Sequence, residues 1–102
     1  MIAALSSSIT SEMKINPNVL SAIESELDRA EGIHPDYPTD PVRRAAILAE
    51  EAGEVVRAAL DLTRPHKRMG YTAAGLTQKM YKEAVHTAAM AVRLLNAMEG
   101  DK

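Results

Sequence analysis

The stretch ILAEEAGEVV, residues 47–56, combines the apolar spacing of a helix with three glutamates in five positions. Because an α-helix turns by about 100° per residue, Glu51 and Glu54 fall on the same side as Ile47, inside the apolar arc. Glu50 falls on the polar side. A buried carboxylate without a partner is costly and tends to take up a proton. The stretch therefore predicts a helix that carries two carboxylates to a packing surface, where their charge must be compensated.

The helix around this stretch is expected to span residues 41–63. Asp40 can cap its first turn, and Pro41 suits the first helical position because proline lacks the N–H that would be unpaired there. The segment RPHKRMG, residues 64–70, ends the helix.

Two further helices are predicted by the same signals. Residues 17–31 follow Asn16 as the N-cap and precede Gly32, which can end a helix. Residues 72–99 begin at Thr72 as the cap and continue an apolar pattern of helical spacing.

The composition favours an all-α fold in a single domain, residues 1–102. Hydrophobic residues make up 46% of the chain and aromatic residues only 3%, so small aliphatic side chains must fill the core. We expect a helical bundle of two long helices and one shorter helix, preceded by an arm at residues 1–15. Because these helices alone leave apolar area exposed, oligomerisation is expected to complete the bundle.

Charge and residue usage exclude several classes of protein. A net charge of −2, from 12 basic and 14 acidic residues, provides no broad basic surface for duplex nucleic acid. The absence of cysteine removes disulfides, thiolate catalysis and cysteine-based zinc sites. No apolar run approaches the roughly 20 residues of a membrane span, and the N-terminus lacks the basic start of a signal peptide. We therefore expect no membrane partner and a cytoplasmic protein.

A second acidic motif, EAVH at residues 83–86, lies on the last predicted helix. The helical period places Glu83 among apolar residues and His86 about 60° away, at the border of the polar face. Carboxylates brought close together raise one another's pKa values unless a cation lies between them. Glu51, Glu54 and Glu83 therefore predict a site for a hard divalent metal held by oxygen ligands.

Each of these residues also has a purely structural interpretation. Glu50 can form a surface ion pair. Glu51 and Glu54 can pair with basic residues of another helix, and Glu83 with a neighbouring lysine. His86 alone would be a hydrogen-bonded helix residue.

The two motifs together resemble the MazG-like all-α nucleoside triphosphate pyrophosphohydrolases. The family pattern is Glu-Glu-x-x-Glu followed by Glu-x-x-Asp, and here EEAGE (50–54) is followed by EAVH (83–86). The resemblance extends over about residues 17–99, and the gap at 55–82 is at the long end of the family range. The resemblance implies a homodimer or homotetramer. It also implies that the protein uses Mg²⁺ or Mn²⁺ to cleave the α–β phosphoanhydride of a nucleoside triphosphate, giving a monophosphate and pyrophosphate.

The family roles are carried over by motif position. The resemblance implies that Glu51, Glu54 and Glu83 are metal ligands, and that Glu50 is a further ligand or orients the attacking water. His86 stands where the family has aspartate. Imidazole accepts Mn²⁺, Fe²⁺ or Zn²⁺ more readily than Mg²⁺, so this departure can shift the metal preference, leave catalysis to the glutamates, or mark a degenerate site.

Substrate contacts are predicted outside the helices. The loop after residue 63 is a candidate for binding phosphate, or else a solvated basic turn; its basic residues are Arg64, Lys67 and Arg68. Three linker residues are candidates for nucleobase contacts: His34, Asp36 and Tyr37.

Two other functions stay open. Glu83-x-x-His86 facing glutamates of another helix is also the local pattern of ferritin-like di-iron carboxylate proteins. A catalytically degenerate helical interaction protein would keep the bundle and lose the metal.

Overall fold

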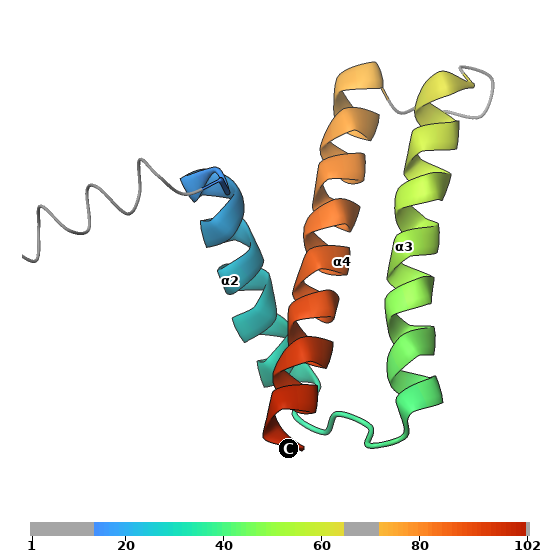
Figure 1. Ribbon diagram of the computed structural model, residues 1–102. Coiled ribbons are helices and arrows are strands. Elements are labelled where there is room, and N and C mark those ends of the chain that lie inside the picture. Colours follow the sequence, from blue (N-terminus) through green and yellow to red (C-terminus); the bar gives the residue numbers. More distant parts are fainter. Residues whose placement is uncertain (1–13, 65–71, 102) are drawn as a thin grey trace, which may run out of the picture.

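A computed structural model describes residues 14–64 and 72–101, and within these ranges the chain is all-helical with no strand. Three helices follow in the order α2 (Pro17–Ile33), α3 (Pro41–Thr63) and α4 (Ala73–Gly100), with 17, 23 and 28 residues (Figure 1). The predicted all-α class is confirmed. Apart from its last two residues, the predicted N-terminal arm lies outside the described residues.

The helices begin where the capping residues predicted. The side chains of Asn16, Asp40 and Thr72 each accept a hydrogen bond from a backbone N–H two or three residues later, at 2.8, 3.0 and 2.9 Å. Each bond pairs one of the N–H groups that the first turn of a helix leaves open.

Two helices continue slightly further than the sequence predicts. α2 passes through Gly32 and ends at Ile33, where the N–H of His34 donates to the carbonyl of Ala30 at 2.8 Å. α4 likewise includes Gly100. Neither glycine adopts the left-handed conformation that would stop a helix.

The central helix is α4, which packs against α3 on one side and α2 on the other (Figure 1). α2 diverges from α4 toward its own N-terminus. Among the described residues, four apolar side chains are fully buried: Ala30, Ala58, Leu76 and Ala89. Three of the four are alanines, and such small side chains let helix backbones approach closely.

Much apolar surface stays outside this small core. Val42, Val56 and Leu95 are 73%, 58% and 59% exposed in the single chain. None of the helices in residues 14–64 and 72–101 has the length and apolar character needed to cross a membrane.

Arg44 connects the linker, α3 and the end of α4. It is the one buried charged residue of the described chain, at 6% exposure. Its Nε donates to the carbonyl of Pro38 at 2.6 Å, and its Nη1 donates to Oδ2 of Asp101 at 2.8 Å. Its guanidinium also lies 5.4 Å from the ring centroid of Tyr37. One side chain therefore joins the linker and the start of α3 to the end of α4, which is distant in sequence.

Arg93 makes a parallel connection from α4. Its guanidinium lies 4.7 Å from the Tyr37 ring centroid and donates to the backbone carbonyl of His34. Two arginines from different helices thus hold the linker in place through cation–π contacts and hydrogen bonds.

Replacing Arg44 by methionine should keep most of the buried stem and remove the hydrogen bonds and the charge. The lost bonds and the unpaired Pro38 carbonyl should lower the free energy of unfolding by about 1–3 kcal/mol, measured by chemical denaturation. The neighbouring exposed Arg43 is the control, and Arg43→Met should change stability by less than about 0.5 kcal/mol. Equal effects of the two substitutions would contradict this role of Arg44.

Candidate metal centre

Three side chains from the two acidic motifs converge between α3 and α4. Glu51 of α3 and Glu83 and His86 of α4 each offer one ligand atom, and these atoms all lie within 4.8 Å of one another. Nδ1 of His86 lies 3.9 Å from Oε2 of Glu51 and 3.9 Å from Oε2 of Glu83. Glu83 and His86 meet because residues three apart project from one face of a helix, and the packing of α3 on α4 adds Glu51.

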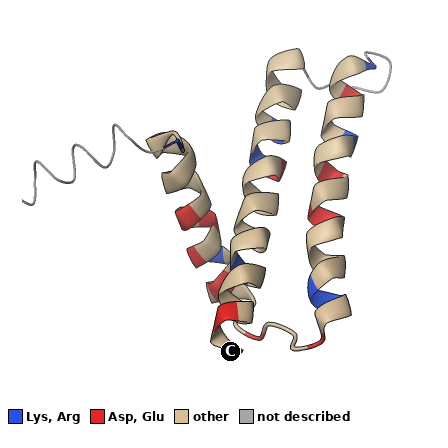
Figure 2. Cartoon of the chain, in the orientation of Figure 1, with Lys and Arg blue, Asp and Glu red and all other residues tan. Residues whose placement is uncertain are grey.

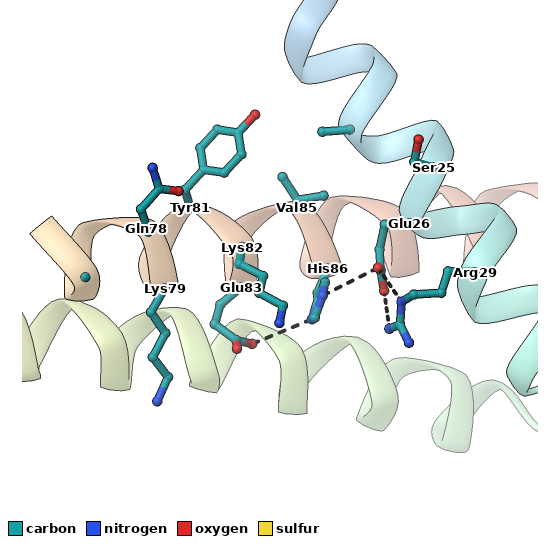
Figure 3. A pocket seen from close by; sticks show the side chains of 12 residues that line it. Ser25, Glu26, Arg29, Gln78, Lys79, Tyr81, Lys82, Glu83, Val85 and His86 are labelled. Carbon is teal, nitrogen blue, oxygen red and sulfur yellow. Dashed lines mark hydrogen bonds and ion pairs between the residues drawn. The ribbon is translucent and has the colours of Figure 1, made fainter. Parts of the chain in front are cut away.

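A fourth residue, Glu26 of α2, approaches the same histidine from the other side. Oε1 of Glu26 lies 3.5 Å from Nε2 of His86 (Figure 3). Arg29 holds this carboxylate through two hydrogen bonds, from Nε to Oε1 at 2.7 Å and from Nη2 to Oε2 at 2.6 Å. The Glu26 side chain is only 12% exposed, against 16% for Glu83 and 32% for Glu51.

Sequence reasoning missed Glu26, although the signal was present. Glu26 lies three residues after Ile23 and four before Ala30, so the helical period places it beside the apolar face of α2. The helical periodicity that places Glu51 and Glu83 among apolar residues therefore indicates Glu26 as well.

The other predicted metal residues lie outside the three-residue cluster. The Glu54 side chain is 44% exposed, and its Oε1 lies 3.7 Å from Nη1 of Arg57 on the same helix. Glu50 is exposed, as expected for the polar side of α3. Figure 2 shows that α2 and α3, on either side of α4, both carry acidic residues. The first motif thus brings one of its three glutamates into the cluster.

The predicted substrate residues lie in two places. His34, Asp36 and Tyr37 line one cavity of about 340 Å³, which Glu51 of the cluster also lines. Arg64 is exposed at the end of α3. Lys67 and Arg68 fall outside the described residues.

A wider groove, of about 700 Å³, runs between α2 and the first half of α4. Glu26, Glu83 and His86 form one part of its wall (Figure 3). Its basic residues are Arg29, Lys79 and Lys82. The cluster therefore borders a groove on one side and the linker cavity on the other.

The electrostatic surroundings move two of the carboxylates in opposite directions. Burial raises the pKa of Glu51 above its ordinary value, and the nearby carboxylates of Glu83, Glu54 and Glu26 add to this, while His86 opposes it. The hydrogen bond from Arg29 lowers the pKa of Glu26, against a smaller opposing effect of burial. The charged form of Glu51 is therefore disfavoured in the folded chain despite His86, whereas Arg29 stabilises the charged form of Glu26.

The donor set fits a divalent transition metal. Two carboxylates and one imidazole are the mixed oxygen and nitrogen ligands that Mn²⁺, Fe²⁺ and Zn²⁺ accept, whereas Mg²⁺ prefers oxygen alone. A cation among Glu51, Glu83 and His86 would also offset the burial and the carboxylate repulsion that together raise the pKa of Glu51.

Comparisons with protein-family models, with curated proteins and with solved structures find no significant match.

Replacing Glu51 by glutamine should raise the free energy of unfolding at pH 7 in the absence of metal. Because the pKa of Glu51 is raised on folding, its ionised form disfavours the folded state, and stability falls as the pH rises through the window between the unfolded and folded values. Neutral glutamine removes this cost. Chemical denaturation at pH 4 to 8 measures it, with the exposed Glu50→Gln as the control. If Glu51→Gln lowered the free energy of unfolding at pH 7 and Glu50→Gln did not, the ionised Glu51 could not be the source of this cost.

Proposed function

We propose that the protein is an oligomeric, metal-dependent nucleotide pyrophosphohydrolase. The observation that supports this most is the convergence of Glu51, Glu83 and His86 within 4.8 Å, because these residues come from the two motifs that resemble the MazG-like pattern. The substrate would be a ribo- or deoxyribonucleoside triphosphate, cleaved to a monophosphate and pyrophosphate.

Each residue of the centre has a distinct task in this proposal. Glu51, Glu83 and Nδ1 of His86 would hold the ion, which when bound screens the phosphate charge and activates a water molecule. Glu54, one turn further along α3, would turn from Arg57 toward the bound substrate complex. Glu50 would act at the solvent side, where it can orient water.

The two cavities beside the centre would each bind a different part of the substrate. The linker cavity would take the nucleobase, with Tyr37, His34 and Asp36 as its contacts, and its 340 Å³ is at the small end of ligand pockets. The basic residues of the groove, Lys79 and Lys82, would hold phosphate oxygens. Both cavities border the cluster, so a substrate bound to the metal can reach them.

A homodimer or homotetramer would cover the apolar surface that the single chain exposes. Val42, Val56 and Leu95 are more than half exposed, and α2 packs on α4 along one side only. Exposed apolar side chains are a common feature of surfaces that associate with another protein chain, so a second copy would cover them and would complete both the core and the substrate site.

A di-iron carboxylate protein is the second candidate. The observation that favours it is that α2 and α3 each direct one glutamate, Glu26 and Glu51, toward Glu83-x-x-His86 of α4. These three helices correspond to two single-glutamate helices and one of the two Glu-x-x-His helices of a ferritin-like centre, so another copy of the chain would have to supply the second Glu-x-x-His.

Calorimetric titration with Mg²⁺, Mn²⁺ and Fe²⁺, followed by pyrophosphate release from a panel of nucleoside triphosphates, tests the proposal. We expect Mn²⁺ or Mg²⁺ binding and metal-dependent pyrophosphate release from at least one nucleotide. Glu51→Gln and Glu83→Gln should each lower metal affinity by at least about 100-fold, because losing a direct ligand should cost no less than the roughly 10- to 100-fold loss typical of outer-shell partners. Glu54→Gln should lower it less, and Glu50→Gln least, because these carboxylates lie outside the cluster.

The outcomes separate the candidates. Tight Fe²⁺ binding without pyrophosphate release would support the di-iron protein. If no metal binds, or if Glu50→Gln and Glu51→Gln change metal affinity equally, the assignment of the metal centre is wrong. The helical interaction protein is then the better proposal.

A further inference from the structure

We infer that Glu26 is a positioning residue that fixes the imidazole of His86, so that Nδ1 is presented to the metal while Nε2–H is held by α2. The inference rests on the metal centre of the proposed function. It adds a residue from a third helix that neither acidic motif contains.

The two ring nitrogens of His86 face different helices. Nε2 lies 3.5 Å from Oε1 of Glu26, whereas Nδ1 lies 3.9 Å from the carboxylates of Glu51 and Glu83 (Figure 3 shows the contacts with Glu26 and Glu83). A neutral imidazole has one N–H donor and one lone pair. With the proton on Nε2, the ring donates toward Glu26 and its Nδ1 lone pair is directed at the metal cluster.

The other tautomer is disfavoured once the metal is bound. It would direct the Nε2 lone pair at the carboxylate of Glu26 and an N–H at the cation. Metal-ligating histidines generally donate their second N–H to a carboxylate, a carbonyl or water, which fixes the tautomer and makes the ligating nitrogen more basic. Glu26 is placed for this role.

Arg29 orients the carboxylate of Glu26 for its contact with His86. Its two hydrogen bonds, at 2.7 and 2.6 Å, fix both carboxylate oxygens in one orientation. Each carboxylate oxygen has two lone pairs, so Oε1 can accept from Arg29 and from His86 together. The side chain of Glu26 is largely buried, whereas that of Arg29 is 54% exposed.

The arrangement should determine metal preference. An imidazole made more basic by a carboxylate favours Mn²⁺, Fe²⁺ and Zn²⁺, whereas Mg²⁺ depends on the oxygen ligands. Glu26 would thus act on selectivity through His86 without touching the metal or the substrate.

Glu26→Gln tests this, with Glu24→Gln as the matched control, because Glu24 is an exposed residue of the same helix and loses the same charge. By calorimetry, Glu26→Gln should lower Mn²⁺ affinity by about 10- to 100-fold and Mg²⁺ affinity less, so the Mn²⁺/Mg²⁺ affinity ratio falls. Glu24→Gln should leave the ratio unchanged. An unchanged ratio in a folded Glu26→Gln variant overturns the inference.

Nitrogen-15 NMR of the Zn²⁺-loaded wild-type protein gives a second readout that does not depend on the folding of Glu26→Gln. We expect the His86 signals, assigned with His86→Gln, to show Zn²⁺ on Nδ1 and a proton on Nε2. Zn²⁺ on Nε2 would overturn the positioning role of Glu26 but would leave the proposed metal centre standing. If no metal binds to the wild-type protein, the proposed centre itself fails.

Discussion

The candidate metal centre depends on one histidine side chain that lies among carboxylates from three helices. His86 has Glu26 on its Nε2 side and Glu51 and Glu83 on its Nδ1 side, at 3.5 to 3.9 Å. So much negative charge at a half-buried position opposes folding unless a cation, a proton or a well-placed arginine compensates it. Arg29 compensates Glu26, and a cation bound among Glu51, Glu83 and His86 would compensate the other two carboxylates.

The helix arrangement makes this convergence possible. α4 carries Glu83 and His86 and, among the described helices, packs closely against both of the others, so its residues can meet side chains from α2 and α3. Arg44 and Arg93 fix the linker between α2 and α3 through Tyr37. The same linker then forms the cavity that Glu51 borders. The contacts that hold the bundle together therefore also shape the candidate substrate site.

The sequence predicted the features that follow from local chemistry. The caps Asn16, Asp40 and Thr72 fixed the helix starts, and the helical period separated the exposed Glu50 from the half-buried Glu51 and Glu83. Contacts between segments far apart in sequence could not be predicted in this way. Arg44 is buried because Pro38 and Asp101 come together around it, and no pattern within α3 indicates that. Glu26 was within reach of the same periodic argument, but only the packing of α2 on α4 shows that it faces His86.

Anomalous diffraction from crystals of the protein grown with Mn²⁺ would locate the metal directly. We expect an anomalous peak between the carboxylates of Glu51 and Glu83 and next to Nδ1 of His86, with Nε2 of His86 facing Glu26. A peak only at exposed carboxylates, or none in a protein that diffracts well enough to show the four side chains, would contradict this expectation.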